Sequence, residues 1–379
     1  MRKLLKIVLA NLLFFLIFGL VALAFLEGGL RVFRSMDDTS VSAVGIPIYQ
    51  SDERHTYSHI PGAIARNGYG EPTPEIRINN LGIRDEDFDE TSPKKNILML
   101  GDSFTFGTGV GQEETFSEIL ETDLGSDYDV WNAGHIGQSI GNYYLWLKKY
   151  AALMKLNAVV VNIFVGNDIT ELRRKNWGFD SQTGDLMQVR DLKVFANDEG
   201  KLESWESREP KFYSLWWLEK RWNVLAHKLK LKDPRTEEPT LTWPVFLAQS
   251  HPGWDPNLPE YWTRFMQGME LIENFGANHD IPIIFALIPM DVQVSPSYET
   301  KYAILQFDEE AREADRPQSI IAHWCELEKA NCADPLKMFR ERTDKDRLYF
   351  SHNADPHFDR LGHQVYAEFL QEALKPILK

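Results

Sequence analysis

A serine stands directly after a short apolar run, at a position where its hydroxyl could act as a nucleophile. The run Asn96–Leu100 (NILML) predicts a buried strand, and Gly101-Asp102-Ser103 leads from it into a helical segment. A serine that opens a helix exposes its hydroxyl and lies among backbone N–H groups that favour developing negative charge. Gly-Asp-Ser is a weak signal by itself, because a serine that only caps the helix has the same surroundings.

Three further polar segments supply groups that such a serine would need. Residues 132–137 (NAGHIG) follow the second predicted strand, residues 165–168 (VGND) follow the third, and residues 355–359 (DPHFD) precede a C-terminal helix. A hydroxyl near neutral pH needs a base within hydrogen-bond reach, and the base needs an acceptor that orients it. His357 and Asp355 could form that pair.

The serine, glycine, asparagine and histidine segments, in this order, resemble the SGNH/GDSL hydrolases. The resemblance spans roughly residues 96–170 and 280–379, and the combination is far more specific than any one segment. It implies a flavodoxin-like three-layer α/β/α fold with a central parallel sheet. Residues 101–105 read GDSFT rather than Gly-x-Ser-x-Gly, so the α/β-hydrolase fold is the poorer match.

The resemblance also implies a role for each site residue. Ser103 would be the nucleophile, and His357 the general base, oriented by Asp355. The backbone N–H of Ser103, the backbone N–H of Gly137 and the side-chain amide of Asn167 would form the oxyanion hole. In the family the acid usually stands three residues before the histidine, whereas Asp355 stands two before it, so its assignment is the weakest of the set.

Other polar residues near these segments have simpler interpretations. We expect His363 to pack or cap within the closing helix, and His352, which has no well-placed acid, to be solvated. His135 could reach the pocket or remain a loop histidine. We expect Asp102 to point away from the nucleophile and bond to backbone, and Asp168 to orient the asparagine loop.

The elements that would position these residues alternate along the chain. The sequence predicts strands at 96–100, 128–132, 158–165 and 281–288, and helices at 115–124, 140–155, 261–278, 318–329 and 361–374. Continuous apolar strands that alternate with helices favour a parallel sheet covered on both faces. Ligands of such sheets bind beyond the carboxyl ends of the strands, where the four polar segments would meet.

We expect three regions in the chain. Residues 1–34 would be a signal anchor, 35–95 a region of hairpins rather than a packed domain, and 96–379 the hydrolase domain, with an insertion at about 168–260. The insertion holds seven tryptophans, which could form its own small core, stack on sugar rings or line an acyl pocket: Trp177, Trp205, Trp216, Trp217, Trp222, Trp243 and Trp254.

The N-terminus has the pattern of a membrane segment. Three basic residues within the first six positions precede the apolar run Ile7–Leu26, which as a helix would be about 30 Å long. Ala22-Leu23-Ala24 resembles a signal-peptide cleavage site. Glu27 and Arg31 are spaced as if the helix continued. We favour an uncleaved transmembrane anchor, with the rest of the chain exported.

Composition excludes several classes of protein. The 379 residues are 43% hydrophobic and 26% charged, which is ordinary for globular proteins and disfavours disorder, coiled coils and polytopic membrane proteins. The net charge is −15, which argues against a nucleic-acid partner. No cluster has metal-ligand spacing, and GTGVGQ lacks the lysine of a phosphate loop, so neither a metal nor a cofactor is predicted.

The two cysteines lie close together in the sequence. Cys325 and Cys332 are seven residues apart, across an expected helix end. On one continuous helix they would be about 10 Å apart along the axis, too far for a disulfide, so a bridge would need a bend near Asn331. An oxidising compartment would favour the bridge, but the spacing leaves it open.

The sequence therefore predicts an exported serine esterase that acts on a small acyl ester or on an O-acyl, such as O-acetyl, ester of an envelope carbohydrate or lipid. An O-acetyltransferase that passes the acyl group to a sugar would use the same residues. A catalytically silent domain for envelope assembly is the third alternative, and the oligomeric state stays open.

Overall fold

The computed structural model describes residues 2–36, 48–66, 74–192, 194–196, 202–204, 212, 214–215, 218, 222, 258–298, 315–351 and 356–378. They belong to two compact units. The first consists of Met1–Ser40 with Arg208–Pro234, and the second of Val41–Ser207 with Arg235–Lys379.

The first unit is built on one long helix, α1 (Arg2–Met36). The predicted continuation of the helix past the apolar run is confirmed, and Arg31 Nε donates to Glu27 Oε1 at 2.7 Å. The other carboxylate oxygen of Glu27 accepts hydrogen bonds from the backbone N–H and the hydroxyl of Ser214. Within the part of the chain that the structure describes, no helix combines the length and the apolarity that a membrane crossing requires.

The second unit contains a five-stranded parallel sheet with the order β6-β5-β7-β12-β13. In chain order this is 2-1-3-4-5, the flavodoxin-like doubly wound arrangement. The four predicted strands are confirmed. The fifth, β13, is three residues long and partly exposed, and a segment this short has no strand pattern in the sequence. The strands are β5 (Lys95–Gly101), β6 (Tyr128–Gly134), β7 (Leu156–Phe164), β12 (Ile283–Ile288) and β13 (Asn331–Ala333).

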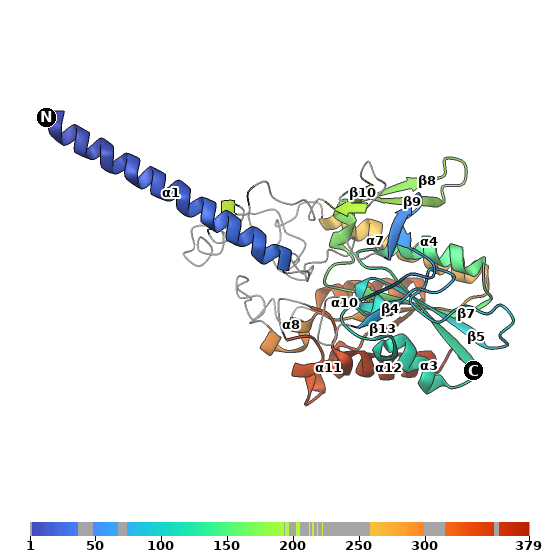
Figure 1. The fold of residues 1–379 in the computed structure, drawn as a ribbon. Helices are drawn as coiled ribbons and strands as arrows, with labels where there is room; N and C mark the ends of the chain where they lie inside the picture. Colours follow the sequence, from blue (N-terminus) through green and yellow to red (C-terminus); the bar gives the residue numbers. More distant parts are fainter. Residues whose placement is uncertain are drawn as a thin grey trace. The chain divides into compact units, whose positions relative to one another are not determined.

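Alternate residues of the strands build two separate cores, one on each face of the sheet. Ile97 and Met99 belong to the core under α3 (Phe116–Leu124), α11 (Leu336–Glu341) and α12 (Arg360–Leu374). Leu98 and Leu100 belong to the core under α4 (Ile140–Ala151), α7 (Leu258–Asn278) and α10 (Arg316–Glu328). Figure 1 shows α3 and α12 on one side of the strands and α4 and α7 on the other. The predicted three-layer α/β/α fold is thus present.

Two antiparallel pairs precede the sheet, as the turn-rich sequence predicts. They are β1 (Tyr49–Asp52) with β2 (Thr56–His59), and β3 (Ile64–Arg66) with β4 (Glu75–Arg77). The two pairs are not isolated from the rest of the fold. Their apolar side chains form a third buried cluster that includes Phe106, from the short helix after β5.

The remaining elements include part of the predicted insertion. Its described elements are η3 (Thr170–Arg174), β8 (Lys175–Phe179), β9 (Leu186–Asp191), β10 (Val194–Ala196) and β11 (Leu202–Ser204). The short helices elsewhere are α2 (Ser103–Phe106), η2 (Gln112–Glu114), α8 (Asp291–Val294) and η6 (Lys345–Arg347).

Of the seven tryptophans, the structure describes Trp177 and Trp222, and the other five lie outside the described residues. Trp177 packs against the core under α4 and α7, and a Cβ on Gly141 would collide with its indole ring. The guanidinium of Arg264 lies 5.1 Å from the centre of that ring. Trp177 therefore has a packing role on the core under α4 and α7.

A disulfide joins Cys325 of α10 to Cys332 of β13, with the two Cα atoms 6.2 Å apart. The helix ends just before Lys329, which has a φ of 58° in the left-handed region, and the chain then turns into the strand. The bend that the bridge requires is thus present, two residues before the position expected from the sequence. The bond fixes the edge strand of the sheet to a helix that covers it.

Replacing both cysteines with serine should lower the free energy of unfolding by about 2–3 kcal/mol, because the bridge restricts the unfolded chain. Urea denaturation under oxidising conditions measures the loss. The reduced wild type is the control and should approach the variant. Equal stability of the oxidised wild type and the variant would contradict the prediction.

Candidate active site

Ser103 begins α2, directly after β5 reaches the carboxyl edge of the sheet. Asp102 is the N-cap of this helix and accepts a hydrogen bond from Phe104 N at 2.9 Å. The helix lies so close to the strands that a Cβ on Gly101 or Gly134 would overlap Thr105 or the backbone of Phe106. The two strand-end glycines therefore permit the approach that leaves Ser103 at the edge of the sheet.

The structure brings Ser103 and His357 together. The two residues are 254 positions apart, and His357 Nε2 lies 2.7 Å from Ser103 Oγ. The loop that carries His357 is fixed by Phe350 N, which donates to His357 O at 3.0 Å, and by an antiparallel bridge between Tyr349 and Phe358. This geometry allows the imidazole to take the hydroxyl proton directly.

Asp355 and His352 lie outside the described residues. The role of Asp355 as the acceptor that orients the imidazole therefore stays a prediction from the sequence.

Asp102 lies closer to the nucleophile than expected. One carboxyl oxygen accepts from backbone, as predicted, but the other lies 3.4 Å from Ser103 Oγ, so the expectation that the side chain points away is wrong for that oxygen. Burial raises the pKa of Asp102 to about 6, although hydrogen bonds and the nearby His357 act against the rise. The hydroxyl of Ser103 nevertheless lies closer to His357 Nε2, at 2.7 Å, than to the Asp102 carboxylate, at 3.4 Å.

Gly137 and Asn167 follow β6 and β7, the two strands that flank β5. Because the three strands are parallel, their carboxyl ends meet at one edge, on either side of the topological switch point. Gly137 has a φ of +72°, which favours glycine. Asn167 is partly exposed, and its Oδ1 has no hydrogen-bond partner among the described residues.

Asp168 holds the turn that carries Asn167, as the sequence predicts. It is fully buried and accepts hydrogen bonds from Tyr143 Oη at 3.0 Å and from Phe164 N at 3.1 Å. Burial and the nearby Asp102 raise the pKa of Asp168. These bonds tie the turn after β7 to α4.

Two sets of buried polar residues near the site were not predicted. Arg84 is fully buried and donates to the carbonyls of Phe106, Gly107 and Val110, at 2.6 to 2.8 Å, so that it holds the C-terminal end of α2. An ionic cluster lies beside Gly137 and consists of Glu171, Arg174, Lys175 and Asp191. Arginine and lysine are so often solvated that their types alone gave no signal of burial.

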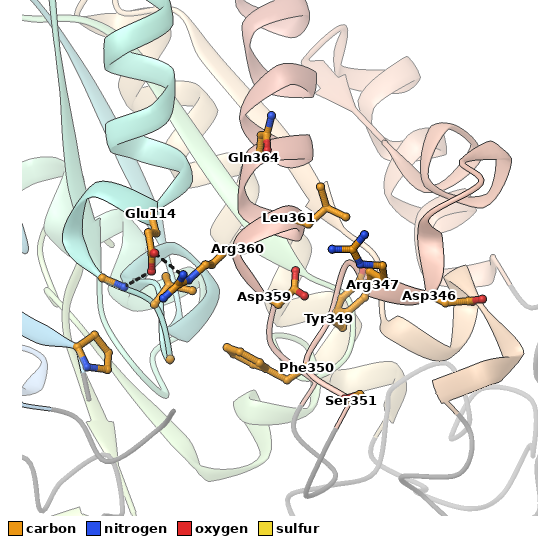
Figure 2. A pocket seen from close by; sticks show the side chains of 14 residues that line it. Glu114, Asp346, Arg347, Tyr349, Phe350, Ser351, Asp359, Arg360, Leu361 and Gln364 are labelled. Carbon is orange, nitrogen blue, oxygen red and sulfur yellow. Dashed lines mark hydrogen bonds and ion pairs between the residues drawn. The ribbon is translucent and has the colours of Figure 1, made fainter. Parts of the chain in front are cut away.

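A cavity of about 640 Å³ lies beside the loop of His357. Figure 2 shows that its walls come from the chain after α2 and from the segments before and after His357, with an ion pair between Glu114 and Arg360 at 2.7 Å. Ser103 and His357 do not line it. The cavity is therefore bounded by the segments next to Ser103 and His357 rather than by these two residues.

His135 is buried in a stack of rings and does not line the cavity beside the His357 loop. It stacks at 4.1 Å on His59 of β2 and at 4.1 Å on Trp146 of α4, and His55 stacks on Trp146 at 3.7 Å. The Nδ1 atom of each imidazole forms a hydrogen bond, His55 with Asp52, His59 with Gly82 O and His135 with Ala133 O. Each Nε2 atom is buried and has no hydrogen-bond partner among the described residues. The described part of the chain holds no group of three side chains placed for a metal ion.

His363 packs in α12 as expected. Its Nδ1 accepts from Phe116 N at 3.2 Å, and its ring stacks on Phe116. Burial lowers the pKa of His363 to about 3, so the ring stays neutral.

The stacked histidines predict a loss of stability in acid. Burial lowers the pKa of His59 to about 3 and also lowers the pKa of His55 and His135. Below about pH 6.5 the unfolded chain takes up protons that the folded stack excludes, so stability falls as the pH falls. His135→Phe keeps a stacking ring and should reduce this loss by up to about 1.4 kcal/mol per pH unit, the limiting slope for one proton.

Chemical denaturation between pH 7 and pH 5 measures the slope of stability for wild type and variant. His323→Phe, at an exposed position on α10, is the matched control and should keep the wild-type slope. Identical slopes for His135→Phe and wild type would contradict the prediction.

No protein family model matches the sequence, and no curated protein matches it. Among solved structures, the chain is similar to a putative lipolytic protein of the G-D-S-L family from Desulfitobacterium hafniense, with a TM-score of 0.37 and 12% identity over 74% of this chain and 100% of that chain.

Two further solved structures give similar values. A lipase/acylhydrolase from Enterococcus faecalis has a TM-score of 0.39 and 13% identity, over 75% of this chain and 97% of that chain. A carbohydrate acetylesterase family member from Sinorhizobium meliloti has a TM-score of 0.37 and 12% identity, over 75% and 99%. At these values the comparisons assign no family to the chain.

Proposed function

We propose that this chain is a serine esterase that cleaves a carboxylic ester through an acyl-enzyme. The observation that carries the proposal is the 2.7 Å contact between Ser103 Oγ and His357 Nε2. A serine that only capped its helix would need no imidazole at its hydroxyl. The contact lies beside the switch point of a doubly wound sheet, where such folds bind their ligands.

The chemistry follows the usual two halves of acyl transfer. Ser103 Oγ attacks the ester carbonyl while His357 takes its proton, and the tetrahedral species collapses as the imidazolium returns the proton to the leaving alcohol. A water molecule, deprotonated by the same imidazole, then attacks the acyl-enzyme and releases the acid. Ser103 regains its proton in this second collapse.

The developing oxyanion needs hydrogen-bond donors that are already in place. We assign the backbone N–H of Ser103, the backbone N–H of Gly137 and the side-chain amide of Asn167. All three follow adjacent parallel strands, which supports the assignment. Asp102 would add a negative charge near the imidazolium, and Asp355 is proposed as the acceptor that orients the ring.

Ser103→Ala and His357→Ala should each lower the turnover of p-nitrophenyl acetate by at least about 10³-fold. The first change removes the nucleophile, and the second removes its base. A fluorophosphonate should label wild type at Ser103. Turnover, labelling and the circular dichroism spectrum are measured together, so that loss of activity is separated from loss of fold.

Two matched variants serve as controls. Ser117→Ala removes a buried hydroxyl from α3, and His279→Ala removes an exposed imidazole from the turn directly after α7. Both variants should keep near wild-type turnover. A wild type that neither turns over esters nor reacts with fluorophosphonate, or a fully active His357→Ala, would contradict the proposal.

We further propose that the enzyme is exported, with α1 as a signal anchor, and that its ester is an O-acyl group of an envelope carbohydrate or lipid. The basic start and the apolar run Ile7–Leu26 support the anchor, and the Cys325–Cys332 bridge suits an oxidising compartment. A C-terminal alkaline phosphatase fusion should be active in cells and sediment with membranes. An inactive fusion that remains in the soluble fraction would overturn the location.

A further inference from the structure

We infer that Tyr57, in the hairpin before the catalytic sheet, is a positioning residue that orients the peptide group between Ile136 and Gly137. This inference rests on the proposed function, which assigns the N–H of that peptide to the oxyanion hole. It extends the active site into a region that the superfamily resemblance does not cover.

The contact itself is short and buried. The hydroxyl of Tyr57 donates to Ile136 O at 2.7 Å, across 79 positions of the chain. Gln138 Nε2 donates back to Tyr57 O at 3.0 Å, so the hairpin and the loop bind each other twice. Tyr57 is 3% exposed, and burial raises the pKa of its hydroxyl far above its ordinary value. The group therefore stays protonated and remains a donor at every working pH.

The loop is a turn whose central peptide needs an external partner. Gln138 N donates to His135 O at 3.2 Å, and Gly137 has a φ of +72° at the third position, as in type II turns. In such a turn the hydrogen bond joins the two end residues and leaves the central C=O and N–H to point outward. Rotation of that peptide toward the type I arrangement would turn the N–H of Gly137 away from its present direction.

Tyr57 opposes this rotation because the C=O of Ile136 and the N–H of Gly137 belong to one planar group. A donor that fixes the direction of the oxygen also fixes the direction of the hydrogen on the opposite side. A hydrogen bond to the carbonyl also polarises the peptide and makes its N–H a stronger donor. Both effects matter most when an oxyanion forms.

The peptide group that follows Gly137 is also held by a buried side chain. Lys175 Nζ donates to Gly137 O at 2.8 Å and to Asp191 Oδ2 at 2.6 Å. Lys175 and Asp191 are buried, and Arg174 Nη2 lies 3.4 Å from the same carbonyl. The carbonyls of Ile136 and Gly137 thus both accept hydrogen bonds from buried donors. The peptide groups before and after the Cα atom of Gly137 are therefore both held in place.

The test replaces Tyr57 with phenylalanine, which keeps the ring and removes only the donor. We expect kcat for p-nitrophenyl acetate to fall about tenfold, which corresponds to one hydrogen bond, with KM within twofold of wild type. A merely structural role would lower the fraction of folded enzyme instead. We therefore express kcat per fluorophosphonate-reactive serine.

Tyr150→Phe is the matched control, since the Tyr150 hydroxyl is also buried but has no partner among the described residues. It should keep the wild-type kcat per site. A Tyr57→Phe enzyme with unchanged kcat, or with an increase in KM alone, would overturn the inference while the esterase proposal stands. Absence of ester turnover and labelling in wild type would instead overturn the esterase proposal.

A second substitution covers the case in which Tyr57→Phe does not fold. 3-Fluorotyrosine at position 57 keeps the hydroxyl and makes it a stronger donor. It should raise kcat per reactive serine by about twofold, because the polarised peptide donates more strongly to the oxyanion. A kcat that is unchanged or lower would count against the inference.

Discussion

The hydrogen bond between Ser103 and His357 can form only because the parallel sheet brings these two distant residues together. Its two residues come from opposite ends of the domain that contains the sheet, and nothing local could bring them within 2.7 Å. The parallel order 2-1-3-4-5 places the end of β5 at the middle of one edge, with β6 and β7 beside it. α12 packs against the same sheet, and the bridge between Tyr349 and Phe358 fixes the loop that precedes this helix. The site is thus a consequence of strand order and of two separate cores.

The sequence predicted the sheet well because its strands are continuous apolar runs and its helices have apolar faces. The same physics explains what it missed. β13 is three residues long, and its strand character comes from pairing with β12 rather than from its own composition. Ser103 and His357 could be predicted because their types and order carry chemistry.

Arg84, Tyr57 and Lys175 could not be predicted as parts of the site. Each is defined by a buried contact with a backbone carbonyl, and residue types alone do not show which carbonyls will be close. Asp102 illustrates the same limit, since the direction of one carboxyl oxygen depends on the fold of the turn. Arg84, Tyr57 and Lys175 thus contact the loops of the candidate site from segments that carry none of its sequence motifs.

The disulfide has a consequence for the outer border of the sheet. A strand at the end of a sheet presents unpaired backbone groups to which another chain could add. Here that strand is only three residues long and is covalently tied to α10. It therefore offers little template for strand addition and cannot slide or peel away while the thiols remain oxidised. The bond therefore protects the folded protein against aggregation through this border, in addition to what it adds to the stability of the monomer.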